Sequence, residues 1–267
     1  MQKPNHEHSG PGQVGSARTL PLLTVSGLTR AFPVRGRVLE DISFTVGEGD
    51  CVIVGGANGS GKSLLMSHIA GLTSPTAGTI LLKGKPISAK GTSGRVGLIF
   101  QEADSQILGE TCREDVEFGL KNLKVPRIDR RLMADACLEK TGLAGKEESP
   151  ARFLSGGEKR RLAVAGVLAM NPELIIFDEP FANLDWPGVQ QVCSIIEMLK
   201  REGKTLIILT HELEKVLGQG NRFLVLHQGK LVFDGAPKEG LSQPLEEWGI
   251  RNPLQAYTSV EDLTWMA

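Results

Sequence analysis

A glycine-rich pattern suited to phosphate binding lies at residues 56–63, which read Gly56-Ala57-Asn58-Gly59-Ser60-Gly61-Lys62-Ser63. It matches G-x-x-x-x-G-K-[ST], follows the apolar run Cys51 to Val54 and precedes a predicted helix, Lys62 to Ala70. Glycines let the backbone curl so that several N–H groups point at one oxyanion, and the helix adds the positive end of its dipole. We expect Lys62 to neutralise β- and γ-phosphate charge and Ser63 to bind Mg²⁺ through its hydroxyl group.

Two carboxylates follow the continuous apolar run Leu174 to Phe177, which is typical of a buried strand. In a parallel sheet the ligand lies at the carboxyl ends of the strands, so Asp178 and Glu179 would emerge beside the phosphate loop. Asp178 is placed to hold Mg²⁺, and Glu179 is the candidate general base that polarises the attacking water. A strand that simply ends in solvated acids is the alternative, but the neighbouring phosphate loop favours the functional interpretation.

A second anion-binding pattern is Leu154-Ser155-Gly156-Gly157-Glu158, in which a serine cap and two glycines open a helix predicted over Gly156 to Ala169. It resembles the LSGGQ signature of the ABC ATPases. The order of motifs agrees with that resemblance: the phosphate loop, Gln101, LSGGE, the acidic strand, Asn183-Leu184-Asp185, and Thr210-His211. The resemblance covers residues 22–235 and is that of a complete nucleotide-binding domain.

The resemblance implies a role for further residues. Gln101 resembles the Q-loop glutamine that approaches Mg²⁺, Asp185 the aspartate at the dimer seam, and His211 the switch histidine that contacts the γ-phosphate. Phe32 falls where the family places an aromatic ring, usually Tyr, against adenine. Taken alone, such a histidine or phenylalanine is more often structural. The expected contacts to ATP and its Mg²⁺ also include the loop positions Gly56, Ala57, Asn58, Gly59, Ser60, Gly61 and Leu64, with Gly59 and Ser60 as backbone donors only.

The two anion sites cannot both serve one ATP within a single chain. In ABC proteins, ATP lies between the phosphate loop of one subunit and the LSGG helix of the other. The resemblance therefore predicts a head-to-tail homodimer or heterodimer. Water would attack the γ-phosphate in line, with charge stabilised by Lys62, Mg²⁺, His211 and the partner's Ser155 to Gly157.

The segment from Arg95 to Leu120 resembles the Q-loop region of energy-coupling factor (ECF) importers, as do Thr210 to Leu217 and the C-terminal stretch Gly240 to Pro253. This subtype implies a peripheral ATPase at the cytoplasmic face of the membrane, with a transmembrane scaffold and a substrate-capture subunit for a metal ion or vitamin. Phe181 and Leu64 depart from the usual family residues. The alternatives are the ATPase of a generic ABC transporter, a soluble ABC ATPase acting on DNA or ribosomes, and a small-molecule phosphotransferase that would leave LSGGE without a role.

The elements that must position these residues are short apolar runs that alternate with amphipathic stretches. Strands are predicted at 22–25, 42–46, 51–54, 79–82, 96–100, 174–177, 205–209, 223–226 and 231–233, and further helices at 130–141, 187–201 and 212–217. This alternation predicts an α/β fold with a largely parallel sheet covered on both faces and an inserted helical lobe. The resemblance specifies a P-loop NTPase (RecA-like) core with an antiparallel β subdomain and an α-helical ABC subdomain.

The chain divides into a flexible tail (1–20), a nucleotide-binding domain (21–235, with its helical subdomain at about 102–169) and a C-terminal extension (236–267). The formal net charge of −1 and a single tyrosine argue against a nucleic-acid partner. No apolar run approaches the ~18 residues of a membrane span, and the N-terminus shows no secretion signal. The four cysteines are far apart and form no C-x-x-C pair.

Overall fold

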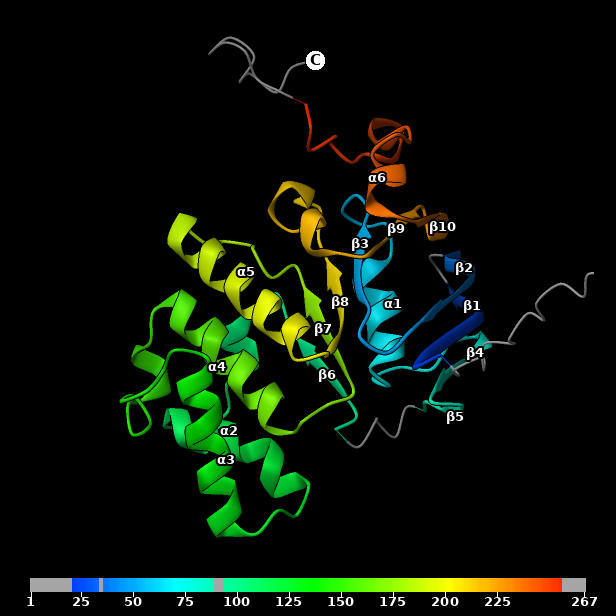
Figure 1. The fold of residues 1–267 in the computed structure, drawn as a ribbon. Coiled ribbons are helices and arrows are strands. Elements are labelled where there is room, and N and C mark those ends of the chain that lie inside the picture. The colour runs from blue at the N-terminus through cyan, green and yellow to red at the C-terminus, as the bar shows by residue number, and fades with distance from the viewer. Residues whose placement is uncertain (1–20, 34–35, 89–93, 256–267) are drawn as a thin grey trace, which may run out of the picture.

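The protein, described here from a computed structural model over residues 21–33, 36–88 and 94–255, is built on a six-stranded sheet (Figure 1). The strands run in the order β10-β9-β3-β8-β7-β6, and all are parallel except β10, which pairs antiparallel with β9. Their bounds are β3 Cys51–Gly55, β6 Val96–Ile99, β7 Leu174–Asp178, β8 Thr205–Leu209, β9 Arg222–His227 and β10 Lys230–Gly235.

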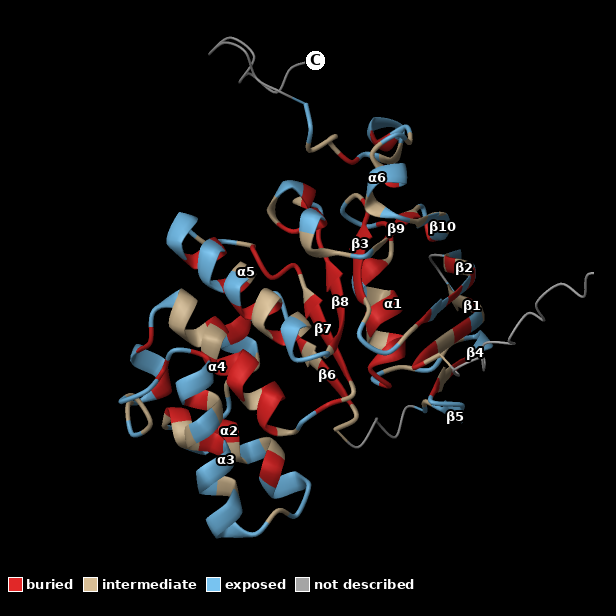
Figure 2. Ribbon diagram, viewed as in Figure 1, coloured by how far each residue is buried: buried red, intermediate tan, exposed pale blue. Residues whose placement is uncertain are grey.

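Side chains along the central strands alternate between two apolar cores. Ile176 of β7 packs into one core, which also holds helix α1 (Lys62–Ile69), whereas its neighbours Ile175 and Phe177 pack into the other. The second core is covered by α5 (Trp186–Arg201) and by residues of α4 (Gly156–Ala169). Because both faces are buried, these strands are apolar throughout, as Figure 2 shows in red.

A second, antiparallel sheet lies beyond α1, in the order β2-β1-β4-β5. Its strands are β1 Leu23–Phe32, β2 Gly36–Val46, β4 Ala77–Leu82 and β5 Lys85–Pro86. Leu23, Leu28 and Ile42 bury their side chains in the same core as α1, so the helix is enclosed between the two sheets. This arrangement places the end of β1 beside the start of α1.

Helices α2 (Cys112–Asn122), α3 (Arg127–Lys140) and α4 form a lobe with a core of its own. Val116, Leu138 and Leu162 are fully buried there. The lobe enters the chain between β6 and β7, and Figure 1 shows α2 and α3 on the outer side of α4. The expected α/β core, antiparallel sheet and inserted helical lobe are thus present, as the fold class predicted.

Beyond β10, helix α6 (Pro237–Gly240) and the short helix Leu245–Trp248 lead to Ile250. Leu245 and Ile250 are buried in the core shared with α5, so this segment packs onto the main sheet. The predicted tail at 1–20 and the last residues of the C-terminal extension (256–267) lie outside the described residues. Within the described ranges, none of the helices has the length and apolar character needed to cross a bilayer.

The main differences from the predicted elements concern two helices and one strand end. The helix expected over 212–217 consists instead of two single turns of 3₁₀ helix, Leu213–Lys215 and Leu217–Gln219. Helix α2 was not predicted at all, and the predicted strand 96–100 ends one residue earlier, at Ile99.

Candidate functional site

The glycine-rich loop joins β3 to α1, and two of its glycines are required by their surroundings. Gly56 has φ 155°, and a Cβ there would lie 2.4 Å from the Leu226 carbonyl oxygen. Gly61 caps α1 with φ 104°, and a Cβ there would lie 2.6 Å from Leu39. Larger residues would therefore push the loop away from β9 and β2. The loop keeps the curled backbone that phosphate binding needs.

Lys62 opens α1 and is buried, with its ammonium group held over the loop. Its Nζ donates to the carbonyl oxygens of Gly56 (2.7 Å) and Ala57 (3.2 Å) and lies 3.7 Å from Oε1 of Glu179. Burial lowers the pKa of Lys62, although the carboxylates of Glu179 and Asp178 act in the opposite direction. A phosphate in the loop would offer this ammonium a charged acceptor, which forms a stronger bond than a carbonyl oxygen.

The acidic end of β7 faces the start of α1. The Ser63 hydroxyl donates to Oδ1 of Asp178 at 3.2 Å, and burial raises the pKa of this carboxyl. A hydroxyl and a carboxylate side by side suit Mg²⁺, which usually takes one or two protein oxygens plus phosphate and water. No cluster of three or more His, Cys, Asp or Glu residues suited to a metal occurs in the described part of the chain. Ser63 and Asp178 are candidate metal ligands, together with Gln101, which lines the same hollow as Ser63.

Glu179 lies between Lys62 and His211. Its Oε2 is 3.0 Å from Nδ1 of His211 and accepts the His211 backbone N–H at 3.3 Å, while Oε1 faces Lys62. The side chain is almost completely buried, and the backbone has φ 46°, a left-handed conformation that is uncommon outside glycine. The parallel register of β7 and β8 brings the two residues together, since Asp178, directly before Glu179, pairs with Leu209, two residues before His211. The Glu179 carboxylate therefore lies between the side chains of Lys62 and His211 and lines the hollow described below, where a water could reach it.

A hollow of about 760 Å³ opens beside the loop and is lined by half of the expected site residues, Asp178 and His211 not among them. Phe32 and Gln101 both line it, although they lie far from the loop in sequence. Pro33 and Val38, which sequence reasoning missed, add apolar wall next to Phe32. Arg30 places its guanidinium 4.7 Å from the centre of the Phe32 ring. The full lining is Phe32, Pro33, Val38, Asn58, Gly59, Gly61, Lys62, Ser63, Leu64, Gln101 and Glu179.

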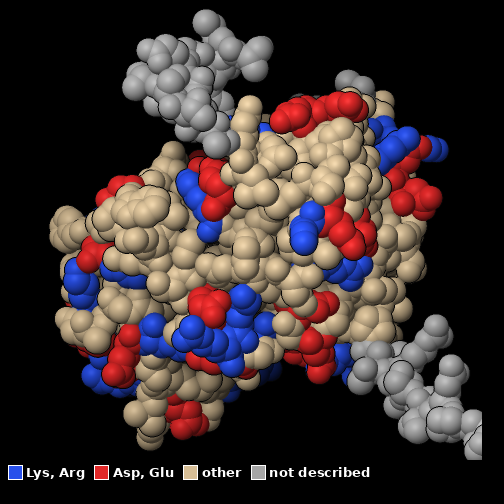
Figure 3. Space-filling model, turned by 45° about the horizontal axis from the view of Figure 1, so that its top comes forward, with Lys and Arg blue, Asp and Glu red and all other residues tan. Residues whose placement is uncertain are grey.

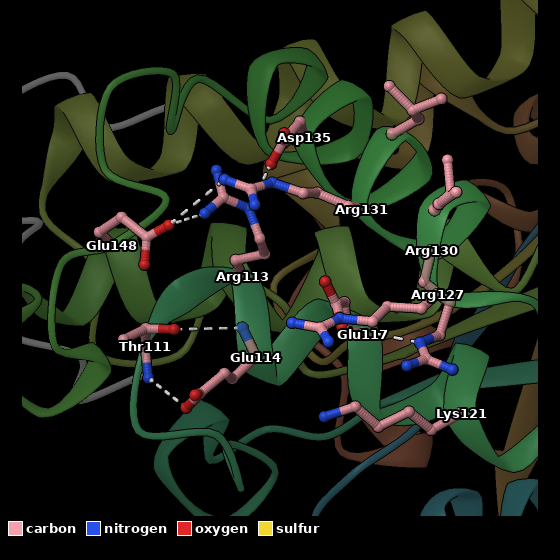
Figure 4. A pocket seen from close by; sticks show the side chains of 12 residues that line it. Thr111, Arg113, Glu114, Glu117, Lys121, Arg127, Arg130, Arg131, Asp135 and Glu148 are labelled. Carbon is pink, nitrogen blue, oxygen red and sulfur yellow. Dashed lines mark hydrogen bonds and ion pairs between the residues drawn. The ribbon is translucent and has the colours of Figure 1, made fainter.

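A second hollow, of about 830 Å³, lies on helices α2 and α3 of the helical lobe (Figure 4). Most of its charged residues pair with one another: Arg113 with Asp135 and Glu148, and Arg130 with Glu117. This hollow has neither a glycine-rich loop nor a converging set of N–H groups. The hollow beside Lys62 is therefore the better candidate for a nucleotide.

Ser155, Gly156 and Gly157 do not line the phosphate-loop hollow. Ser155 caps α4: its Oγ accepts the Glu158 N–H at 3.3 Å, and Oε2 of Glu158 accepts the Ser155 N–H at 2.8 Å. Ser155 and Gly156 are exposed. A Cβ built on Gly156 would meet nothing within 4 Å, so packing within the chain does not require glycine there. Asp185 is likewise outside the lining and caps α5 through the Gly188 N–H at 2.9 Å.

Comparisons with known proteins give three matches that extend over most of the chain. A family model described as ABC transporter matches residues 39–182. The chain is 39% identical over 233 residues to the energy-coupling factor transporter ATP-binding protein EcfA of Methanocaldococcus jannaschii, covering 85% of this chain and 84% of that protein. It is 36% identical over 244 residues to the cobalt import ATP-binding protein CbiO of Rhodobacter capsulatus, covering 88% and 86%.

Among solved structures, cbiO1 from Clostridium perfringens, part of the ABC transporter complex cbiONQ, superimposes with a TM-score of 0.76. It is 33% identical to this chain, and the match covers 84% of this chain and 91% of that one. The similarity thus includes both sheets and the helical lobe and is not limited to the phosphate loop.

Proposed function

The chain belongs to the ABC transporter family, as an ATP-binding and ATP-hydrolysing subunit, and we propose that it energises uptake of a metal ion or vitamin through an ECF-type membrane complex. The observation that carries the assignment of the site is the convergence of Lys62, Ser63, Asp178, Glu179 and His211 at one edge of the parallel sheet. The names of its relatives, an energy-coupling factor ATPase and a cobalt import ATPase, support the subtype.

In the proposed reaction, Glu179 accepts a proton from the water that attacks the γ-phosphate, while Lys62 and His211 stabilise the charge that develops on the phosphate oxygens. Ser63 and Asp178 would hold Mg²⁺, whose charge offsets that of the β- and γ-phosphates. Gln101 reaches the same hollow from the end of β6 and would join the metal shell. Phe32, which also lines the hollow, would supply an apolar face for adenine.

We infer a head-to-tail dimer from the position of the Ser155-Gly156-Gly157 helix end. This helix end is capped and exposed, yet it does not line the hollow of its own chain. Its exposed N–H groups and the positive end of α4 suit a phosphate. The open space around Gly156 leaves room for a ligand to approach the backbone closely. ATP on one subunit would therefore be completed by α4 of a partner, either a second copy or a paralogue.

Docking to a membrane scaffold is supported by the exposed apolar side chains. Among the described residues, most of the large exposed ones lie between residues 100 and 153, in the Q-loop region and the helical lobe. These are Phe100, Leu108, Phe118, Leu123, Ile128, Leu132, Met133 and Phe153, whereas Leu72, Trp186, Val232 and Leu254 lie elsewhere. The loop after β6 is held in shape by Gln106, which accepts the Phe100 N–H at 3.1 Å and donates to the Leu98 carbonyl at 3.0 Å. We place the protein peripherally, at the cytoplasmic face of the membrane.

A nucleic-acid partner receives no support from the charge distribution. On the face drawn in Figure 3, lysine and arginine side chains gather most densely at the lower left, but aspartate and glutamate side chains lie among and beside them. The net charge of the whole chain is −1. Nucleic-acid binding usually draws on a basic excess, so a membrane complex is the better-supported setting.

The test is co-expression with the membrane subunits encoded beside the gene, followed by membrane fractionation and uptake of labelled cobalt, nickel or vitamins. We expect the protein to sediment with membranes and the cells to accumulate one such solute. Leu108→Glu should release the protein from the membranes, because it places a charge on the proposed docking surface. Lys62→Ala should leave the protein on the membranes but abolish uptake.

A protein that stays in the soluble fraction with its membrane subunits present would contradict the transport role and favour a soluble ABC ATPase. Membrane association with uptake or export of an unrelated solute would instead indicate a generic ABC transporter. Both outcomes leave the ATPase assignment in place.

A further inference from the structure

Arg160 lies in the second turn of α4 and buries its guanidinium, with only 6% of the residue exposed. The group donates to three backbone carbonyl oxygens: NH2 to Gln101 at 2.7 Å and to Ala182 at 3.3 Å, and NH1 to Glu179 at 3.2 Å. It forms no ion pair with any carboxylate of the described residues, and its Nε has no hydrogen-bond partner there. A buried cation that bonds only to carbonyl groups is unusual and costly, so its contacts call for a function.

The three carbonyl groups belong to segments that form the nucleotide hollow. Gln101 and Glu179 both line it. Ala182 closes a turn that begins at Glu179, since its N–H donates to the Glu179 carbonyl at 3.2 Å. Arg160 therefore forms hydrogen bonds to both ends of this turn and also to Gln101, at the start of the segment that follows β6. The turn contains the left-handed backbone of Glu179, which needs such external support to persist.

The same helix begins at Ser155-Gly156-Gly157, one turn before Arg160. Because an α-helix is stiff over one turn, a shift of that helix end is passed on to the guanidinium and to the three carbonyl groups. We propose that Arg160 is a positioning residue that fixes Gln101 and Glu179 to α4, so that the hollow of its own chain responds to what the Ser155 end of α4 binds. The proposal rests on the proposed function of the hollow, and it adds a contact that links the two phosphate-binding segments of one chain.

Arginine suits this position for a geometric reason. Its planar fork presents several N–H groups in fixed directions and stays charged even where burial lowers the pKa of Arg160. A lysine would carry the charge but has a single ammonium head, which reaches fewer of the three carbonyl groups. A methionine would fill a similar volume with no donor, and such replacements of buried charges are often tolerated by the fold.

The experiment compares Arg160→Met and Arg160→Lys with the wild-type protein and with a control, Arg130→Met. Arg130 is also an arginine of the helical lobe that donates to a backbone carbonyl, Val125 at 2.9 Å, but it does not line the nucleotide hollow. ATP hydrolysis gives kcat and KM, a fluorescent nucleotide gives Kd, and amide hydrogen exchange without nucleotide reports the turn at Ala182 and the segment 101–106.

We expect Arg160→Met to lower kcat by about tenfold to a hundredfold with Kd changed less than threefold, since small displacements of catalytic groups have effects of this size. Amide exchange should rise at Ala182 and in 101–106 but not along α3. Arg160→Lys should recover part of kcat, and Arg130→Met should match the wild type.

A wild-type kcat in Arg160→Met, or a kcat that falls only together with nucleotide affinity, would overturn the proposal. If Arg160→Met does not fold, Arg160→Lys decides by the same comparison of kcat with Kd. Glu179→Gln, assayed alongside, separates the positioning role of Arg160 from the proposed function of the site. Loss of hydrolysis in Glu179→Gln but not in Arg160→Met would refute the positioning role alone, whereas a wild-type protein that neither binds nor hydrolyses ATP would refute the function of the site.

Discussion

At the scale of single residues, Glu179 is the carboxylate best placed to activate water, because Lys62 and His211 hold its two oxygens toward the hollow. We predict that Glu179→Gln slows ATP hydrolysis by about 100-fold or more, since general-base help is typically worth 10² to 10⁴. ATP binding should persist, because glutamine keeps the shape of the side chain and removes only its charge. Phosphate release and nucleotide binding, measured on the same preparation, check both parts.

The matched control is Glu173→Gln, at the opposite end of the same strand. Glu173 pairs with Arg95 at 2.6 Å and Lys83 at 3.0 Å, away from the phosphate loop. Its substitution should leave turnover within about twofold of the wild type, as for surface changes remote from a site. Equal turnover in Glu179→Gln and wild type would remove Glu179 from the general-base role.

The site residues that could be predicted from the sequence are those that belong to one contiguous motif. Lys62 and Ser63 follow their glycines directly, and Asp178 and Glu179 follow their strand. Arg160 could not be found in this way, because its partners are backbone carbonyl groups, which every residue has whatever its side chain. Pro33 and Val38 reach the hollow only because β1 and β2 fold over α1, which no local pattern specifies.

At the scale of elements, the start of α4 depends on a reciprocal cap between Ser155 and Glu158. The hydrogen bond from Lys146, followed by that from the Ser155 backbone, lowers the pKa of Glu158 to about 2 from an ordinary 4.5. A folded-state pKa below the unfolded one means that the ionised group stabilises the fold above pH ~4.5. This stabilisation is lost as the pH falls toward 2.

We therefore predict that Glu158→Gln, which keeps the cap but loses the charge, destabilises the protein at pH 7 by about 1 kcal/mol or less. The difference in Tm from the wild type should shrink as the pH falls from about 5 toward 2, because the Glu158 carboxylate of the unfolded wild-type chain takes up its proton before that of the folded protein. Thermal unfolding at a series of pH values measures it. Glu246→Gln, at an exposed position, is the control for the loss of one surface carboxylate. A Glu158→Gln difference that grows toward low pH would contradict the assigned sign.

The two element errors have physical causes. Leu213, Val216 and Leu217 have the spacing of a helical face and are buried, but the chain there forms two single turns of 3₁₀ helix, the second of which contains Gly218 and is followed by Gly220. Burial of an apolar face therefore does not establish an α-helix over so short a segment. Helix α2 carries a start signal, Thr111 followed by Glu114 as a capping box, but its many charged residues obscured the apolar stripe of Val116 and Leu120.

At the scale of the whole molecule, the two segments proposed to bind phosphate lie in different parts of one chain. The glycine-rich loop belongs to the core between the sheets, and the Ser155 helix end belongs to the helical lobe. Only the first lines the hollow that would hold ATP. In the proposed head-to-tail dimer, a complete site would require two chains, and each dimer would contain two sites, each built from the loop of one chain and the helix end of the other.

This geometry can be tested by placing two disabling changes, Lys62→Ala and Ser155→Arg, in differently tagged copies that are purified as mixed dimers. With one change in each copy, both disabled halves meet in the same site, and the second site stays intact. With both changes in one copy and none in the other, each site contains one disabled half. We therefore predict about half of the wild-type ATP hydrolysis per dimer in the first arrangement and nearly none in the second, if the two sites act independently. Activity in the second arrangement and none in the first would show that each chain encloses its own ATP.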